Sequence, residues 1–426
     1  MAEVEVVRDP LWDNIRIDAA TMRLVDDPAV QRLRYVRQLG HAFLVYPGAT
    51  HSRFEHALGA FHLARRALAA LQERGELDGV PPADVQALPW AALLHDVGHY
   101  PFSHALEEAG FPSHEGVGTA KLDRGSLGAT LRDLGGAGLA GRIAALMTGR
   151  SASPLAGLVS GSLDLDKIEY LSRDAHMCGV PYGNVDVNRL LASLTLVEAA
   201  PGRVEVGVLE KGLSALESLL FAKYQMYRNV YWHHAVRAAT CMFKRAVRAA
   251  VAHRRLAPAE LVDATDDQLL ERLVARGPAP LVERLRARRL YKRALELPAS
   301  DVPADAQPWL WEDAALLEAV EDRLAAELGA APGAVLLDYP ARPSMLAVDL
   351  PLRTRDGRVE RLTGEGRAGA LGLPRVAEAL YQSARRLRVF TGEPVGVRPA
   401  AVLRLVTRPA ADLRTALAAA RPLLAD

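Results

Sequence analysis

The stretch LLHDVGHYPFSH, residues 93–104, places three histidines and an aspartate directly after an apolar run. The segment LPWAALLH (88–95) has the apolar spacing of a helix that enters a core, so we expect His95 and Asp96 to be buried. A buried carboxylate is costly unless it is paired or bound to a metal. Two interpretations follow: the pair ligates a metal, or His95 is a hydrogen-bonded core residue and Asp96 is the N-cap of a second helix.

Two further stretches carry the same residue types, HSRFEHALG (51–59) and SLDLDKIEYLSRD (162–174). Two imidazoles and two carboxylates neutralise a divalent ion and leave coordination positions open for water and substrate. Bound water then has a lowered pKa and becomes a nucleophile near neutral pH. We expect one divalent ion, with Mn, Mg, Fe, Ni and Zn all compatible, whose ligands come from three segments: His56, His95, Asp96 and Asp166.

Two basic residues lie beside these predicted ligands. Arg53 precedes His56 by about one helical turn, and Lys167 directly follows Asp166. Guanidinium and ammonium groups beside a metal site are typical phosphate binders. The alternative for Asp166 and Lys167 is a solvated helix face with a surface salt bridge.

The bulk composition is that of an ordinary folded protein. The 426 residues are 50% hydrophobic and 24% charged, and the formal net charge of +1 gives no polyelectrolyte signal. Two cysteines exclude a disulfide framework and favour a reducing compartment. The N-terminal segment is acidic and alternating, unlike a signal peptide, and no apolar run reaches the roughly 20 residues of a membrane span. We expect a cytoplasmic protein without a membrane partner.

The periodicity of the chain changes twice. Residues 3–17 alternate between apolar and polar, which predicts a β-hairpin with its turn near Asp9-Pro10. From about 19 to 330 the apolar spacing is helical, most clearly over 213–255 but also in the charged region 256–310, with one strand candidate at 203–209.

After about residue 330 strand patterns return. They cover 333–340, 350–362 and 397–407, the middle one a hairpin turned by Asp356-Gly357, and a helix over 410–424 closes the chain. The predicted fold class is mainly α, with a helical core over 1–328 and a small C-terminal α/β lobe over 329–426.

The order of the motifs resembles that of the HD-domain phosphohydrolases, and more narrowly the deoxynucleoside triphosphate triphosphohydrolases, which include the mammalian sterile-α-motif HD-domain enzyme. The resemblance covers roughly residues 5–245. It is carried by five segments in the family's order: DDPAVQRLRYVRQLGHAFLVYPGATHSRFEHALG (26–59), LLHDVGHYPFSH (93–104), SHEG (113–116), LDKIEYLSRDAHMCGV (165–180) and YRNVYWHH (227–234).

The resemblance implies a role for each matching residue. The metal ligands are again His56, His95, Asp96 and Asp166. His99 and His104 line the site near the phosphates, and His114 is a candidate proton donor to the leaving oxygen. The triphosphate is contacted by Arg53, Lys167 and Tyr170, and the sugar by Gln38, Leu39, Asp174 and Tyr231.

Simpler structural roles stay open for several of these residues. His104 is also suited to cap a helix, and His233 and His234 to pack. Tyr170 lies at helical spacing from Asp166, which is also typical of a core residue. Leu39 and Tyr231 are compatible with core positions at the ends of their helices.

The implied reaction is water attack at the α-phosphorus of a dNTP, which gives a deoxynucleoside and tripolyphosphate, with deoxyribose preferred over ribose. One alternative is an HD phosphohydrolase that acts on another nucleotide, such as a monophosphate or a cyclic dinucleotide. A second is a regulator that binds nucleotides or nucleic acid without turnover.

The resemblance also implies a homo-oligomer, a dimer or a tetramer, with a nucleotide activator between subunits. Asp26, Gln31 and Arg34 match that activator pocket, but Glu5 stands where the mammalian enzyme has a lysine. A carboxylate there repels a triphosphate, so we expect the activator site to be lost or altered.

Overall fold

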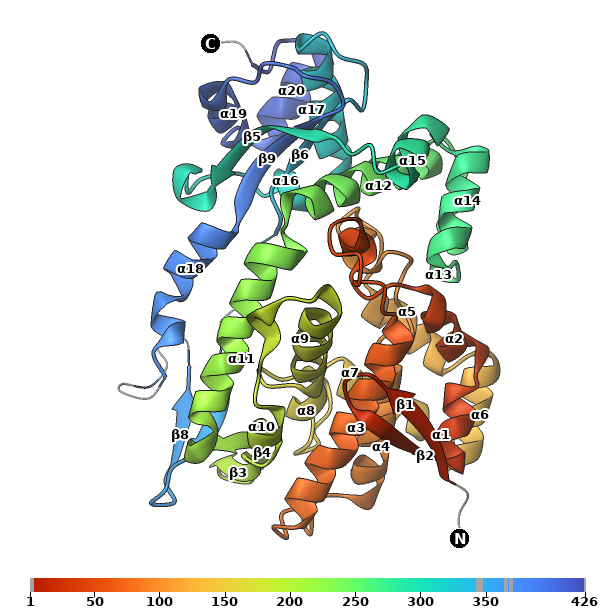
Figure 1. The fold of residues 1–426 in the computed structure, drawn as a ribbon, viewed down its shortest axis with the longest axis vertical. Coiled ribbons are helices and arrows are strands. Elements are labelled where there is room, and N and C mark those ends of the chain that lie inside the picture. The colour runs from red at the N-terminus through yellow and green to blue at the C-terminus, as the bar shows by residue number, and fades with distance from the viewer. Residues whose placement is uncertain (1–3, 342–347, 364–366, 368–370, 425–426) are drawn as a thin grey trace.

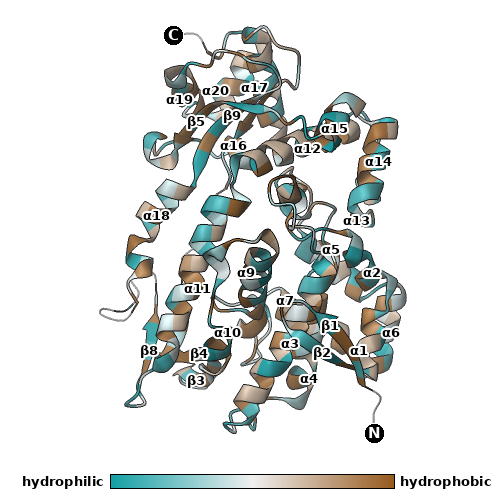
Figure 2. Ribbon diagram, viewed as in Figure 1, coloured by the Kyte–Doolittle hydropathy of each residue, from teal (hydrophilic) through white to brown (hydrophobic). Residues whose placement is uncertain are grey.

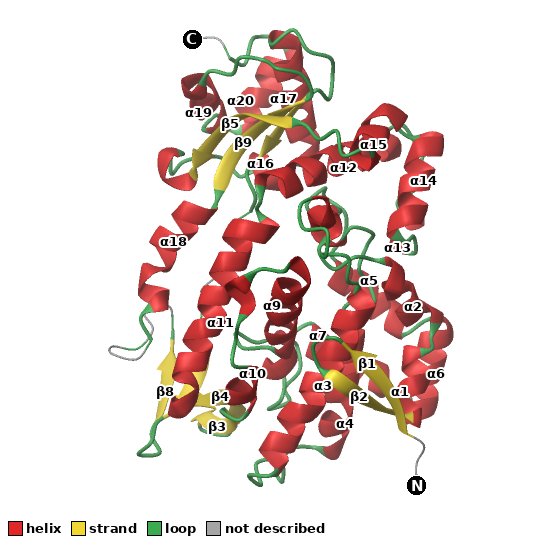
Figure 3. Cartoon of the chain, viewed as in Figure 1, coloured by secondary structure: helices red, strands yellow, loops and turns green. Residues whose placement is uncertain are grey.

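Helices dominate the structure, a computed structural model that describes residues 4–341, 348–363, 367 and 371–424 (Figure 1, Figure 3). The predicted mainly α fold class is confirmed. The first half of the chain forms a β-hairpin and a helical body: β1 Val4–Asp9, β2 Asp13–Asp18, α1 Ala19–Val25, α2 Pro28–Gln31, α3 Arg53–Gln72, α4 Pro82–Leu94, α5 His114–Leu122, α6 Gly125–Gly135, α7 Leu139–Met147, α8 Gly157–Ser160, α9 Leu165–Cys178 and α10 Val187–Leu191.

The second half adds two long helices and two sheets. Its elements are β3 Leu194–Ala200, β4 Arg203–Leu209, α11 Leu213–Met226, a π-helical turn Tyr227–Tyr231, α12 His234–Ala252, α13 Ala259–Val262, α14 Asp266–Arg276, α15 Ala279–Arg286, β5 Lys292–Pro298, α16 Trp309–Glu312, α17 Ala314–Glu327, β6 Val335–Asp338, β7 Leu350–Arg353, β8 Val359–Leu362, α18 Ala377–Ala384, β9 Arg386–Thr391, α19 Pro399–Val406 and α20 Ala410–Ala418.

The N-terminal hairpin forms where the alternation predicts it. β1 and β2 pair antiparallel from Val4↔Asp18 to Asp9↔Asp13. The carboxylate of Asp9 accepts the backbone N–H groups of Leu11 and Trp12, which closes the turn after the first strand. The side chains that point inward from β2 are fully buried, so the hairpin packs onto the helical body.

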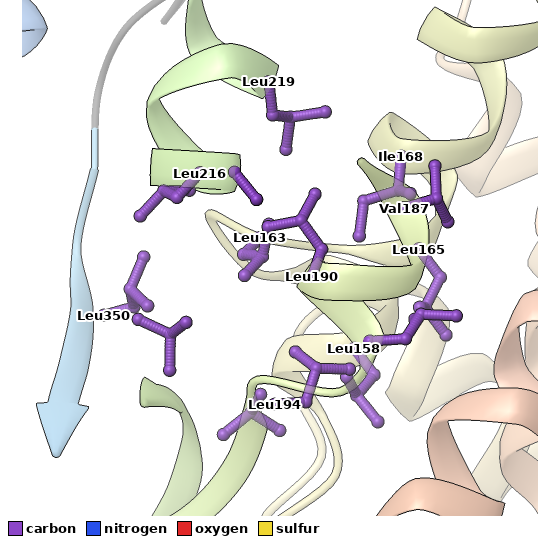
Figure 4. Packing of buried hydrophobic residues seen from close by; sticks show 14 of the residues in the cluster. Leu158, Leu163, Leu165, Ile168, Val187, Leu190, Leu194, Leu216, Leu219 and Leu350 are labelled. Carbon is purple, nitrogen blue, oxygen red and sulfur yellow. The ribbon is translucent and has the colours of Figure 1, made fainter. Parts of the chain in front are cut away.

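The central hydrophobic core lies between α9, α10 and α11 and the sheet beside them (Figure 4). Ile168 from α9, Leu190 from α10, Leu216 from α11 and Leu350 from β7 all belong to it. Along α11 and α14 hydrophobic and hydrophilic residues alternate, so each helix has one face for a core and one for solvent (Figure 2). Within the described residues no helix combines the length and apolar character needed to cross a membrane.

Both sheets join strands that are distant in the sequence. One has the order β3-β4-β7-β8, with β4 and β7 parallel, and the other has the order β5-β9-β6. Strands before and after residue 328 are therefore hydrogen-bonded to one another in each sheet. The domain boundary at 328 stays a prediction.

Four sequence predictions need correction. Residues 397–407 do not form a strand; they contain α19, because Pro399 begins a helix and the buried Ala401, Val402, Leu405 and Val406 follow helical spacing. The region predicted as helical over 256–310 contains the strand β5. Two strands, β3 and β9, were not predicted, because each is recognisable only from its partners. The helix predicted over 213–255 is interrupted by the π-helical turn.

Truncating a fully buried core residue tests this packing. Leu190→Ala is expected to lower the free energy of unfolding by about 2–5 kcal/mol, because the cavity left behind loses its contacts. Urea denaturation measures the change. Val6→Ala, at a strand position where the side chain is 55% exposed, is the control and is expected to change it by only about 0.5 kcal/mol. Equal effects of the two variants would contradict this core.

Candidate metal centre and adjoining cavity

Three helix ends bring the predicted ligands together. Ser52 caps α3 in a capping box, which places His56 on the first turn of that helix. α4 ends at Leu94, so His95 stands at its C-terminus. Asp164 caps α9 through the backbone N–H of Lys167, two residues before Asp166 in the sequence. Sequence-distant segments therefore meet through their capped ends.

The donor atoms of the four predicted ligands surround one point. Nε2 of His56 lies 3.2 Å from Nε2 of His95 and 3.0 Å from Oδ1 of Asp166. Nε2 of His95 lies 3.4 Å from the same Asp166 oxygen and 3.3 Å from Oδ1 of Asp96. Oδ2 of Asp96 lies 3.6 Å from Nε2 of His56.

In each neutral imidazole the proton is on Nδ1, where it is hydrogen-bonded. Nε2 of both rings is therefore unprotonated. Nδ1 of His56 lies 2.6 Å from a carboxylate oxygen of Glu169 and therefore donates to it. Nδ1 of His95 lies 2.8 Å from the backbone carbonyl of Ala92 and donates there. Outer partners of this kind fix the tautomer of a metal-binding histidine. Two nitrogen lone pairs thus face each other beside two carboxylates.

The pKa shifts of these residues show that the site favours a bound positive charge. Burial lowers the pKa of His56, but hydrogen bonds to Asp166 and Glu169 outweigh burial and raise it to about 10. For Asp166, burial raises the pKa, and the two imidazoles overcome that effect and hold the pKa well below its usual range. The carboxylates thus favour a cation at the imidazoles, either protons or a metal ion.

The spacing of the donors is suited to a divalent ion. Ligand atoms about 2.1 Å from an ion lie about 3.0 Å apart in adjacent octahedral positions and about 3.4 Å apart in a tetrahedron. Three of the residues, His56, His95 and Asp166, have donor atoms within 4.8 Å of one another, and Asp96 adjoins them. The residues present therefore fit a bound divalent metal.

Asp96 links this centre to Arg53. One of its oxygens accepts a hydrogen bond from the Arg53 guanidinium, and the other lies 3.2 Å from Nε2 of His99. Arg53 also donates to the hydroxyl of Ser103. Asp96 is buried and caps none of the described helices, which removes the alternative of an N-cap.

A second group of imidazoles lies beside the first. The ring of His99 stacks on that of His114 with centroids 3.8 Å apart, and Glu107 hydrogen-bonds to both His104 and His114. Gly98 permits this stacking, because a Cβ there would lie 2.1 Å from the carbonyl of His114. These four polar residues could also hold an ion, but Glu107 already engages two of the rings.

A cavity of about 760 Å³ opens beside the metal centre. Eight of the predicted site residues line it: Gln38, Leu39, Arg53, His104, Asp166, Tyr170, Asp174 and Tyr231. Six other predicted residues are not among its lining residues: His56, Asp96 and His99 are buried, and His95, His114 and Lys167 are half-buried.

Asp174 is held between two partners at the cavity wall. One oxygen lies 2.8 Å from Nε2 of His51, and the other accepts the hydroxyl of Tyr231 at 2.7 Å. Burial and the neighbouring Asp174 raise the pKa of Tyr231 well above its usual value, so the phenol stays protonated. Tyr231 therefore lines the cavity with one part of its ring and also packs against the central core.

Lys167 forms the salt bridge that the structural alternative predicts. Its ammonium contacts the carboxylate of Asp164 and donates to the carbonyl of Gly161 at 3.0 Å. A second ammonium lies near: burial and Lys167 lower the pKa of Lys223 to about 8. Asp166, one residue before Lys167, points instead to the imidazoles.

Sequence reasoning gave no role to four residues that organise the site. His51 and Glu169 lie inside the quoted motifs, where their spacing from Arg53 and Asp166 was the available signal. Glu107 follows the histidine motif by three residues. Asp266 gave no local signal: it comes from α14 and accepts the backbone N–H groups of Arg37 and Phe102. These bonds hold the left-handed Phe102 and the loop beside it in place.

Comparison with protein families identifies two regions. A model of the HD domain matches residues 53–159, and a model of the HD associated region matches residues 185–364. The matched HD domain contains three of the four predicted metal ligands. The fourth, Asp166, lies between the two matched regions.

Similar proteins occur in several organisms. An uncharacterized protein of Methanocaldococcus jannaschii is 37% identical over 68% of this chain and 60% of its own length. An uncharacterized protein of Bacillus subtilis is 32% identical over 56% of this chain and 54% of its own. The deoxynucleoside triphosphate triphosphohydrolase SAMHD1 of Danio rerio is 28% identical over 54% of this chain and 42% of its own. This chain thus spans about half the length of these relatives.

Solved structures share the fold over nearly the whole chain. A phosphohydrolase from Bacteroides thetaiotaomicron superimposes with a TM-score of 0.71 over 91% of this chain and 100% of its own, at 22% identity. A hypothetical protein from Aquifex aeolicus gives 0.69 over 92% and 97%, at 26% identity. The first likeness bears on the fold alone.

Removing one predicted ligand tests the metal centre. We expect about one divalent ion per chain in the wild type and its loss in Asp166→Ala, because a carboxylate and part of the negative charge disappear. Elemental analysis of the purified proteins measures the content. His104→Ala, whose side chain is 59% exposed and lies outside the ligand set, is the control and keeps the ion. An Asp166→Ala protein with wild-type metal content would contradict the site.

Proposed function

Because the chain belongs to the HD-domain phosphohydrolases, we propose that it is a metal-dependent deoxynucleoside triphosphate triphosphohydrolase. Water attacks the α-phosphorus, the bond from that phosphorus to O5′ of the sugar breaks, and O5′ takes up a proton. The products are a deoxynucleoside and tripolyphosphate. The observation that carries the proposal is the pair of facing imidazoles and two carboxylates beside a cavity lined with cationic and hydroxyl groups.

The metal ligands in this proposal are His56, His95, Asp96 and Asp166. A divalent ion bound by them supplies a Lewis acid and lowers the pKa of a water molecule near neutrality. Glu169 contributes by holding the ring of His56 through Nδ1. Replacing such an outer partner typically weakens metal binding about 10- to 100-fold.

The phosphates bind at the same end of the cavity. Arg53 lies on the cavity wall and already pairs with a carboxylate, so its guanidinium is fixed in orientation. Lys167 and Lys223 add positive charge beside Asp166. Tyr170 lines the cavity as a neutral phenol, because burial raises its pKa well above the usual value. A guanidinium, ammonium groups and a phenol hydroxyl together are suited to bind a triphosphate chain.

The proton for the leaving O5′ comes from the second imidazole group. His114 is the donor in this proposal, with His99 stacked on its ring and Glu107 hydrogen-bonded to Nδ1. It is not a lining residue of the cavity, but its ring lies 5.3 Å from that of His104. Glu107 also orients His104, which lines the cavity. A carboxylate bonded to Nδ1 fixes the orientation and the tautomer of the ring.

The sugar lies between Gln38, Leu39, Asp174 and Tyr231. Oε1 of Gln38 is buried and, among the described residues, has no hydrogen-bond partner, so it is available to a sugar hydroxyl. Asp174 is fixed by His51 and Tyr231 and offers acceptors for the 3′-hydroxyl. Leu39 and the ring of Tyr231 crowd the 2′ position in this proposal.

The assembly is part of the proposal: a homo-oligomer, a dimer or a tetramer, in the cytoplasm. Glu5 is exposed on the hairpin, and Arg34 donates to the side chain of Gln31. A nucleotide bound beside Glu5 would be repelled by its carboxylate. An activating nucleotide therefore binds at a site that differs from that of the mammalian enzyme.

Product analysis tests the reaction. The protein is incubated with each dNTP and Mn²⁺ or Mg²⁺ in H₂¹⁸O, and the products are separated by chromatography. We expect deoxynucleoside and tripolyphosphate in equal amounts, with ¹⁸O in the tripolyphosphate, because water adds to the α-phosphorus. Asp166→Ala is the control and is expected to be inactive. Release of a nucleotide with orthophosphate or pyrophosphate would contradict this reaction and favour another HD phosphohydrolase activity.

Sugar selectivity gives a second test. We expect wild-type kcat/KM to favour dGTP over GTP by roughly tenfold to a hundredfold, because a ribose must bury its 2′-hydroxyl without a partner. Tyr231→Ala is expected to narrow this ratio. Tyr182→Ala is the control, since Tyr182 packs on the same core but does not line the cavity. Equal use of dGTP and GTP by the wild type would remove the sugar clamp.

A further inference from the structure

The cavity is larger than the metal centre and the sugar clamp require. Beyond Tyr231 it continues along α12 to the C-terminal lobe, where α16, α17 and the end of β6 form its wall. The lining residues of this far half come from both parts of the chain: Val236, Thr240, Leu310, Trp311, Leu337 and Tyr339. An apolar, aromatic wall with a few polar groups is typical of a small-molecule site.

The charges of the far half do not suit phosphates. Arg237 donates to both oxygens of Glu108 at 2.9 Å and to Asp338 at 2.6 Å, and Lys244 also contacts Glu108. Two cations are thus matched by two carboxylates. At the opposite end Arg53 pairs with Asp96 and Lys167 pairs with Asp164, and the predicted metal ligands lie beside these pairs. With the phosphates of a bound dNTP at the metal centre, as the proposed function requires, its uncharged ring extends toward the lobe.

A buried histidine supplies a polar group in this region. The ring of His41 stacks on Phe102 with centroids 4.3 Å apart and 7° between planes, and it also contacts Phe243. It lines the cavity, is 4% exposed, and its Nδ1 has no hydrogen-bond partner among the described residues. Burial and the nearby Arg37 lower the pKa of His41 to about 3, so the ring is neutral. A neutral imidazole offers one donor and one acceptor.

The aromatic wall is held rigidly by the lobe. Trp311 and Tyr339 meet edge to face at 6.0 Å, and the guanidinium of Arg385 lies 3.5 Å over the ring of Tyr339. Arg237 ties Asp338, the residue before Tyr339, to Glu108 of the helical core. The wall is therefore tied to the helical core, which supplies His41 to the same cavity.

We infer that the far half of the cavity is a base-binding subsite, in which the C-terminal lobe supplies the wall through Trp311 and Tyr339 and His41 reads the polar edge of the nucleobase. This inference rests on the proposed function and names the recognition element of the same site. Trp311 and His41 are specificity-determining residues here and take no part in the chemical step.

The experiment compares substrates that differ only in the base. The kcat/KM values for the four dNTPs and for 2-deoxyribose 5-triphosphate, which has no base, are measured in wild type, Trp311→Ala and His41→Phe. Trp311→Ala is expected to lower the dNTP values about tenfold, the usual scale of one base–aromatic contact, and to leave the base-free value within about twofold. His41→Phe keeps the stack on Phe102 and is expected to narrow the spread among the four dNTPs.

A neighbouring tryptophan separates recognition from stability. Trp309 is buried in the core of the same lobe, donates to the carbonyl of Arg408, and does not line the cavity. Trp309→Phe is expected to lower the thermal midpoint of unfolding and to leave the ratio of dNTP to base-free substrate unchanged. If Trp311→Ala lowers both substrates equally, or changes neither, the subsite is overturned.

Binding provides a readout that does not need turnover. Calorimetry with Mg²⁺ compares a non-hydrolysable dNTP analogue with tripolyphosphate, in wild type and Trp311→Ala. The subsite requires the analogue to bind more tightly than tripolyphosphate, with the difference reduced in Trp311→Ala to the part that the sugar contacts supply. That result without any dNTP hydrolysis would contradict the proposed reaction and leave the subsite standing. Hydrolysis of dNTPs with no base-dependent binding would overturn the subsite alone.

Discussion

Two imidazole nitrogens that face each other at 3.2 Å are the constraint around which the site is organised. Each ring is locked by its other nitrogen, His56 on Glu169 and His95 on the carbonyl of Ala92, so neither can turn away. Such an arrangement is unfavourable without positive charge between the rings. The helix caps, the buried positions and the carboxylates around the rings together hold a preorganised cation-binding site.

Glu169 connects this constraint to the N-terminal hairpin. Besides His56 it accepts the indole N–H of Trp12 and pairs with Arg173, which in turn pairs with Asp9. The contact is so close that a Cβ on Gly59 would lie 2.0 Å from a Glu169 oxygen. The hairpin thus braces the metal centre through buried charges, and removing one partner would leave another charge unpaired.

The sequence predicted what local patterns determine. Alternation predicted the hairpin, helical spacing predicted the body, and the histidine and aspartate motifs predicted which residues gather at the centre. Strands β3 and β9 were not predicted, because a strand whose sheet is completed by strands distant in the sequence has little local signal. Residues 397–407 were misread because their apolar content outweighed their helical spacing. His41 and Asp266 matter through tertiary contacts alone, which no spacing in the sequence reveals.

The shared sheets have a consequence for any shortened form of this protein. β4 pairs with β7, and β5 pairs with β9, so cutting the chain after residue 328 would strip partners from strands that remain. Exposed strand edges recruit other chains and promote aggregation. The helical portion expressed by itself would also lose the apolar cover that the lobe places over it. Insolubility of such a fragment would therefore report broken sheets and carry no information about catalysis.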